Sequence, residues 1–109
     1  MLLVIKNIDL LRFGGNMYVI LVYDIVLDNK KGNRVLNNVY KICKKYLTHI
    51  QNSVFEGELT KAKLMKLKLE LDKYIRDDKD SVIVFKSRQS RWLKKEFWGV
   101  EDDVTSNFF

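Results

Sequence analysis

Residues 18–26 read Tyr-Val-Ile-Leu-Val-Tyr-Asp-Ile-Val, an almost continuous run of β-branched and aromatic side chains. Such a run favours a β-strand, and the lack of polar alternation is typical of a strand covered on both faces. Strands of this kind lie inside their sheet, with a neighbour on each side. We therefore expect these residues to form the central strand of the fold.

Two helices and a second strand are predicted downstream of this run. Apolar residues recur at helical spacing over residues 33–47, with Asn33 as the N-cap. A second helix is predicted over residues 61–75, with Thr60 as its N-cap. Residues 81–85 read as another buried strand. The core stripe of the second helix is expected to comprise Leu64, Leu67, Leu71 and Tyr74.

The segment between the two helices decides the topology. Residues 49–59 are extended in character, with bend or bulge signals at Asn52-Ser53 and Gly57. The predicted order fits an α+β, ferredoxin-like (βαββαβ) sandwich if this segment supplies both middle strands, or one long bent strand in their place. Both helices would then cover one face of the sheet. The uncovered face is a reason to dimerise, and apolar C-terminal side chains could cover it in a partner.

The composition predicts a single small, basic, intracellular domain. The chain has 109 residues, a net charge of +6, one Cys and one His. Cys43 alone excludes an intramolecular disulfide, and with His49 it falls short of the four ligands of structural zinc. Its place on the apolar stripe of the first helix favours a small core side chain over a nucleophile.

Residues 1–16 are expected to form an N-terminal extension outside the core, with residues 17–109 as the single domain. The extension is apolar but interrupted by charges, so its longest uncharged run is too short to span a membrane. It also lacks the features of a secretory signal. Gly14-Gly15-Asn16 separates it from the strand. The alternative is an edge strand or a short helix packed on the core.

Positive charge is concentrated in the first predicted helix and the loop before it. Residues 29–49 contain no carboxylate and six basic side chains, namely Lys30, Lys31, Arg34, Lys41, Lys44 and Lys45. Such a segment attracts phosphates and makes binding fall with salt. The alternative is a solvated lysine-rich helix face, and charge alone does not decide between the two.

Asp24 is the one carboxylate whose position suggests chemistry. It follows a run of uncharged residues near the end of the central strand, where a carboxylate is costly unless it is paired or binds a metal. The alternative is that Asp24 caps the following loop. Mg²⁺ needs only one or two carboxylates plus water, so two copies of Asp24 meeting at a dimer axis would make a credible site. No nucleophilic triad or glycine-rich phosphate loop is present.

Several blocks together resemble the CRISPR-associated protein two family. They are Met17-Tyr-Val-Ile-Leu-Val-Tyr-Asp-Ile25, Asn33-Arg34-Val35, Ile50-Gln-Asn-Ser-Val-Phe-Glu-Gly-Glu-Leu-Thr60 and Asp80-Ser-Val-Ile-Val-Phe85. The ending Ser106-Asn107-Phe108-Phe109 is similar too. The resemblance covers about residues 17–109, and the first and third blocks are specific when taken together.

The resemblance implies a ferredoxin-like homodimer in which an extra C-terminal strand crosses to the partner's sheet. It also implies a cytoplasmic role in spacer acquisition, in which the dimer bridges the CRISPR-associated integrase and holds spacer DNA. Members are described as Mg²⁺-dependent endonucleases of single-stranded RNA or double-stranded DNA. Asp24 matches their catalytic, metal-binding aspartate, with Mg²⁺ expected and Mn²⁺ as the alternative ion. Positions around that site are matched by Tyr23, Arg34, Ser53 and Phe55.

Two functions from different classes follow. In the nuclease hypothesis, Asp24 from both protomers holds one metal ion, while Arg34 and Ser53 steady the scissile phosphate. In the architectural hypothesis, the dimer is a scaffold without catalysis, and Lys30, Lys31, Arg34 and the rest of the helix grip nucleic-acid backbone. Where many relatives carry a basic residue before Ile50-Gln51, this chain has His49, which would weaken phosphate contact at neutral pH.

Overall fold

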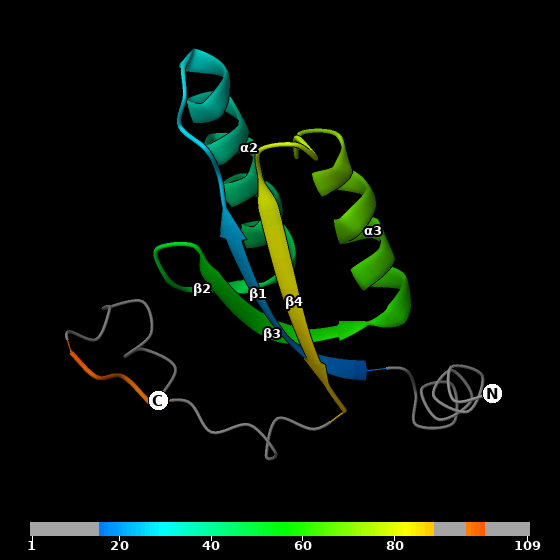
Figure 1. Ribbon diagram of the computed structural model, residues 1–109. Helices are drawn as coiled ribbons and strands as arrows, with labels where there is room; N and C mark the ends of the chain where they lie inside the picture. Colours follow the sequence, from blue (N-terminus) through cyan, green and yellow to red (C-terminus); the bar gives the residue numbers. More distant parts are fainter. Residues whose placement is uncertain (1–15, 89–95, 100–109) are drawn as a thin grey trace.

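The computed structural model describes residues 16–88 and 96–99, and the elements follow one another in βαββαβ order (Figure 1). Strand β1 spans Asn16–Asp24 and helix α2 spans Lys30–Tyr46. The hairpin strands are β2 (Thr48–Gln51) and β3 (Val54–Thr60). Helix α3 (Lys61–Asp72) and strand β4 (Ser81–Ser87) complete the fold. Residues 96–99 form no strand, and the remaining positions for the strand expected to cross to a partner, residues 89–95 and 100–109, lie outside the described part, as does all but the last residue of the expected extension.

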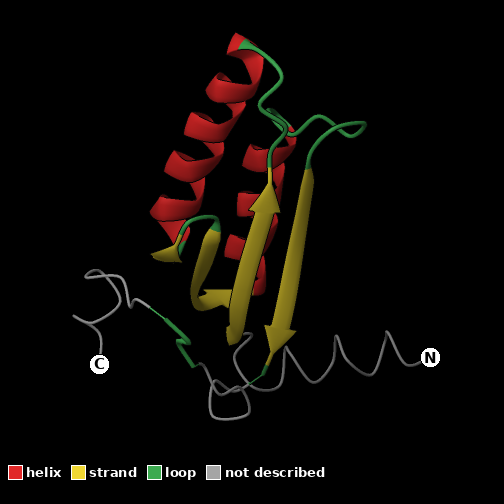
Figure 2. Cartoon of the chain, turned by 60° about the vertical axis from the view of Figure 1, so that its left-hand side comes forward, coloured by secondary structure: helices red, strands yellow, loops and turns green. Residues whose placement is uncertain are grey.

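The four strands form one antiparallel sheet in the order β2-β3-β1-β4. Strand β1 is therefore central, as predicted, with Ile20 opposite Glu56 of β3 and Phe85 of β4. Both helices lie on the same side of the sheet (Figure 2). Element order, strand order and layering together confirm the ferredoxin-like sandwich.

The core lies between the sheet and the two helices. Alternate residues of β1, from Met17 to Tyr23, point toward the helices and are buried. Cys43 on α2 is fully buried, and this burial raises the pKa of its thiol to about 12. The thiol is therefore a core side chain rather than a nucleophile, as expected. The helices contribute further buried residues, namely Val35, Val39, Ile42, Leu67 and Leu71.

The prediction that β1 and β4 are both covered on two faces is wrong for this chain alone. The face of the sheet without helices, called here the open face, carries Ile20 and Val22 of β1, both only half-buried. On the same face β4 presents Ile83 and Phe85, which are 53% and 54% exposed. Strand β4 is also an edge strand, because only β1 pairs with it among the described strands. The two strands are apolar as predicted, but no element of this sandwich covers their open face among the described residues.

Helix α3 begins where the sequence predicts, whereas the start of α2 and the end of α3 differ from the prediction. Thr60 caps α3 as predicted, because its Oγ1 accepts a hydrogen bond of 3.1 Å from the Lys63 amide. Helix α2 begins earlier than expected, and its N-cap is Asn29, not Asn33: Asn29 Oδ1 accepts from the Lys31 amide at 2.8 Å. Helix α3 ends at Asp72 rather than at residue 75. The predicted stripe is buried at Leu67 and Leu71, half-buried at Leu64, and exposed at Tyr74.

Residues 49–59 supply both middle strands. The turn between β2 and β3 is Asn52-Ser53, the pair that the sequence marked as a bend. Asn52 has a φ of 43°, in the left-handed region that asparagine tolerates better than most residues. The strand register also shifts between His49 and Gln51. No helix among the described residues is long and apolar enough to cross a membrane.

Candidate functional site

Asp24 is the last residue of β1, and its carboxylate lies exposed on the open face of the sheet. The strand alternation explains this orientation, because the preceding Tyr23 points into the core and Asp24 must point the other way. Its partner across the sheet is Ser81, the first residue of β4. Among the described residues, no hydrogen bond or ion pair occupies the carboxylate. Asp24 is therefore available to a cation or a substrate, and it does not cap the following loop.

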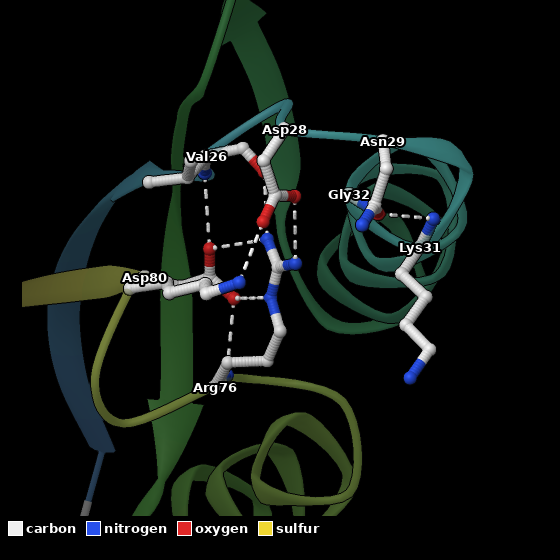
Figure 3. A network of polar contacts seen from close by, with 8 residues as sticks. Val26, Asp28, Asn29, Lys31, Gly32, Arg76 and Asp80 are labelled. Carbon is white, nitrogen blue, oxygen red and sulfur yellow. Dashed lines mark hydrogen bonds and ion pairs between the residues drawn. The ribbon is translucent and has the colours of Figure 1, made fainter.

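The chain just after Asp24 is held by a polar network (Figure 3). Arg76, which follows α3, donates through Nη2 to the Val26 carbonyl oxygen at 2.6 Å. Its Nε and Nη2 also form a two-pronged pair with Asp80, at 2.9 and 3.0 Å. Asp80 Oδ1 in turn accepts from the Val26 amide at 3.0 Å. Both main-chain polar groups of Val26 are thus fixed by side chains that lie about fifty residues away in the sequence.

The same network holds the loop that leads into α2. Arg76 Nη1 and Lys79 Nζ bind the two oxygens of Asp28, at 3.0 and 2.6 Å. These hydrogen bonds lower the pKa of Asp28 to about 2. The loop also packs tightly against the first turn of the helix, since a Cβ on Gly32 would lie 2.4 Å from the Val26 carbonyl oxygen. Only glycine allows this approach.

The β2–β3 turn supports Asp24 from the other side. The Tyr23 amide donates to the Ser53 carbonyl oxygen at 3.2 Å, which brings the turn beside the end of β1. The turn is itself braced by His49, whose Nε2 donates to the Asn52 carbonyl oxygen at 2.7 Å. The His49 ring also packs on Phe55, with centroids 4.9 Å apart. His49 therefore shapes the turn rather than standing free beside it.

Two residues that the resemblance put around the site lie beneath it. The side chains of Tyr23 and Phe55 are 4% and 0% exposed, with ring centroids 6.0 Å apart. Burial also raises the pKa of Tyr23 to about 12, so this phenol stays protonated. As contacts to nucleic acid these two assignments are wrong for this chain alone, because a buried ring offers no surface to a phosphate. They belong to the apolar core beneath the end of β1.

The basic residues of α2 are exposed, and they lie opposite the buried face of the helix. Lys30, Lys31 and Arg34 occupy its first turns. Among the described residues, no hydrogen bond or ion pair joins them to Asp24. The structure therefore brings Ser53 and Asp24 together through Tyr23, and presents the α2 cations as a separate surface. That surface comprises Lys30, Lys31, Arg34, Lys41, Lys44 and Lys45, and we call it the α2 basic stripe.

The donor set fits a hard metal ion only in part. A carboxylate oxygen is the ligand that Mg²⁺ prefers, and an ion held by one or two carboxylates completes its shell with water and substrate phosphates. No group of three or more His, Cys, Asp or Glu side chains able to hold a metal occurs among residues 16–88 and 96–99. In the described part of the chain, Asp24 is thus not joined by a cluster of further ligands, and a second copy of the chain would double its charge.

Arg76 and Asp80 are the residues of this region that sequence reasoning missed as a pair. Their four-residue spacing is that of an ion pair on a helical turn. In the sequence they flank Asp77, Asp78 and Lys79, and the four residues from Asp77 to Asp80 read as a charged turn. The spacing could have pointed to the ion pair, but nothing local points to Val26.

Asp80 makes the stability of this region sensitive to acid. Hydrogen bonds from Arg76 lower its pKa from 3.8 to about 2, so folding favours the ionised carboxylate. The resulting stabilisation is complete above the unfolded pKa and is lost as the pH falls from about 4 to about 2. Denaturant titrations should show this loss in the wild type and a flatter profile in Asp80→Asn, whose remaining slope includes the contribution of Asp28. Parallel profiles for the two proteins would contradict the assignment.

Comparison with known proteins gives a consistent result. The family model for CRISPR associated protein Cas2 matches residues 17–95. The CRISPR-associated endoribonuclease Cas2 of Fusobacterium nucleatum is 56% identical over 104 residues, which cover 94% of this chain and 97% of that protein. This match is longer than residues 17–109 and so includes part of the segment before Met17. That residues 1–16 lie outside the core stays a prediction.

A more distant relative and two solved structures agree. The CRISPR-associated endoribonuclease Cas2 of Methanosarcina acetivorans is 38% identical over 91 residues, covering 84% of this chain and 98% of that protein. A crystal structure of Cas2 is 38% identical with a TM-score of 0.67, covering 81% of this chain and 92% of that one. The Streptococcus pyogenes Cas2 crystal structure at pH 6.5 is 28% identical with a TM-score of 0.63, covering 73% and 99%.

Proposed function

The chain belongs to the CRISPR-associated Cas2 family, and from this premise we propose that it is a cytoplasmic, metal-dependent endoribonuclease that works as a homodimer in CRISPR defence. The observation that carries the proposal is Asp24, an exposed carboxylate at the end of the central strand that none of the described residues engages in a hydrogen bond or ion pair. The chain on both sides of it is held rigidly, by Ser53 before it and by Asp80 and Arg76 after it. The curated relatives are named endoribonucleases.

Asp24 is the residue that we propose to be catalytic, as the ligand of Mg²⁺, with Mn²⁺ as the alternative ion. When bound, such an ion polarises a phosphate and lowers the pKa of bound water. The exposed position leaves room for an RNA strand to reach the carboxylate from solvent. The half-buried Ser53 and the exposed Arg34 are the proposed phosphate contacts of this site. Tyr23 and Phe55 would support the site from the core.

A homodimer is proposed because a single Asp24 makes a poor ion site. Two copies related by a two-fold axis would bring two carboxylates together, provided that their open faces meet. The apolar side chains of that face, including Ile83 and Phe85, supply the contact that such a dimer needs. Burying them would also give β1 and β4 the second cover that their sequences predict.

The experiment that tests this function is an RNA cleavage assay with the purified chain. We expect single-stranded RNA to be cut in the presence of Mg²⁺ or Mn²⁺ and to stay intact with excess EDTA. A parallel reaction with double-stranded DNA shows whether the chain cuts RNA, DNA or both. Intact RNA at every metal concentration and pH would overturn the nuclease proposal for this chain.

The α2 basic stripe favours a second candidate, an architectural role in spacer acquisition. In this role the homodimer bridges the CRISPR-associated integrase and holds spacer DNA without cutting it. The stripe runs along the side of α2 opposite its buried residues and faces solvent, and its last residue, Lys45, also pairs with Glu70 of α3. Its cations would contact phosphates rather than bases, which suits binding to duplexes of any sequence. Copurification with the integrase and a spacer-integration assay would test it.

Binding of duplex DNA should depend steeply on salt if the stripe grips the backbone. Replacing Lys30, Lys31 and Arg34 by glutamine removes three phosphate contacts. The slope of log Kd against log salt should then become shallower by about 2 to 3. The matched control replaces three exposed lysines of α3 (Lys63, Lys66 and Lys68), and its slope should stay close to that of the wild type. Equal changes in both triple variants would contradict a specific role for α2.

A further inference from the structure

The structure assigns Arg76 as the positioning residue for Asp24: its guanidinium fixes the direction of the chain leaving β1, and thereby the place of the Asp24 carboxylate and its affinity for a cation. This inference rests on the proposed function, because it concerns the same site. It adds a residue from the segment between α3 and β4, whereas the other proposed contacts lie on α2 and on the β2–β3 turn.

No side chain among the described residues holds Asp24 through a hydrogen bond or ion pair. Its carboxylate lies on the open face, so its position is set by the main chain alone. On one side the Tyr23 amide is bonded to Ser53, at 3.2 Å. On the other side the Val26 amide and carbonyl are bonded to Asp80 and Arg76, at 3.0 and 2.6 Å. Asp24 therefore sits between two fixed points three residues apart.

The fixed point at Val26 depends on the planar shape of the Arg76 guanidinium. Arg76 uses Nε and Nη2 on Asp80, Nη2 also on the Val26 carbonyl, and Nη1 on Asp28 (Figure 3). This planar fork fits a carboxylate and a carbonyl oxygen at once, whereas a lysine ammonium is a point charge on a flexible stem. A lysine at this position keeps the charge and loses the geometry.

Burial holds this network in place. The Asp80 side chain is 0% exposed and that of Arg76 is 18% exposed. Asp80 accepts four hydrogen bonds, two on each oxygen: from the amide of Val26 and from the amide, Nε and Nη2 of Arg76. Removing Arg76 would leave a buried carboxylate without its counter-charge, which is costly. Replacing a supporting group of this kind typically lowers metal affinity or rate by about 10- to 100-fold.

The test compares Arg76→Lys with a matched control, Lys79→Ala. Lys79 binds the other oxygen of Asp28 at 2.6 Å, and its side chain makes no hydrogen bond or ion pair with Val26 or Asp80. Mn²⁺ alone is the probe, and its binding is followed by paramagnetic broadening of the Asp24 resonances. In Arg76→Lys the Mn²⁺ dissociation constant should rise by about 10-fold or more, and the Val26 amide should exchange hydrogen faster. Lys79→Ala should match the wild type in both.

Cleavage kinetics separate positioning from general destabilisation. In Arg76→Lys, kcat for RNA should fall by about 10 to 100-fold while KM stays constant, because the α2 basic stripe is untouched. Methylguanidinium should restore Mn²⁺ binding to Arg76→Ala, whereas methylammonium at the same concentration should not. Wild-type Mn²⁺ affinity in folded Arg76→Lys would overturn the inference. If the wild type cuts no RNA, the proposed function fails, and Mn²⁺ binding still decides the inference.

Discussion

Replacing Asp24 by asparagine is expected to lower the rate of RNA cleavage by about 1000-fold or more and to leave the fold intact. The amide has the same shape as the carboxylate but carries no charge to hold a metal ion. Asp24 is exposed and makes no hydrogen bond or ion pair with the described residues, so its replacement should change the free energy of unfolding by less than about 0.5 kcal/mol. Initial rates in Mg²⁺, with thermal unfolding measured on the same samples, check both parts.

The matched control for this prediction is Asp72→Asn. Asp72 is an exposed aspartate at the end of α3, which lies on the side of the sheet opposite the open face (Figure 2), and its variant should cut RNA at the wild-type rate. Undiminished cleavage by Asp24→Asn would place the reaction elsewhere. Loss of cleavage together with intact spacer integration would make the architectural role the biological one.

Subunit mixing tests whether one ion needs both copies of Asp24. Wild-type chains are mixed with excess Asp24→Asn chains and allowed to exchange. If each site needs two carboxylates, activity per wild-type chain falls as mixed dimers replace wild-type dimers. Constant activity per wild-type chain would mean that each Asp24 works alone.

Local chemistry explains how far the fold could be predicted from the sequence. The apolar run around Asp24 predicts a central strand because few other structures bury so many β-branched side chains in a row. Thr60 was found as an N-cap because its hydroxyl bonds only three residues ahead. The start of α2 was missed because Asn29 and Asn33 both fit a cap. Gly32 reads as a loop residue, although it lies inside the helix to allow the close approach to Val26.

In the candidate site, too, the residues marked by a local pattern were predictable and those with distant partners were not. Asp24 stands out in the sequence because a charge at the end of an apolar strand needs a reason. The contribution of Arg76 and Asp80 was not predictable, because their partner Val26 lies fifty or more residues away and offers only main-chain atoms. The resemblance names residues around a site but does not say which face of a strand they occupy. Tyr23 and Phe55 therefore proved to be core residues.

The second large effect is expected on the open face of the sheet. Replacing Phe85 by glutamate should raise the dissociation constant of the homodimer by about 100-fold or more, since it would bury an unpaired charge at the interface. Phe85 is 54% exposed in the single chain, so the substitution should leave the sandwich itself folded. Sedimentation equilibrium measures the dissociation constant. RNA cleavage should be lost at concentrations where the wild type is dimeric.

The control for Phe85→Glu is Leu69→Glu, on the outer side of α3. Leu69 is 64% exposed, so Leu69→Glu also replaces an exposed apolar side chain by a charge. The replacement lies on the side of the molecule that carries the helices. This variant should remain dimeric and active. A dimeric Phe85→Glu would mean that the open face is not the interface, whereas a monomer with full activity would mean that one Asp24 suffices. Loss of both properties together ties the apolar face to the carboxylate at its edge, because Phe85 and Asp24 then act through the same assembly.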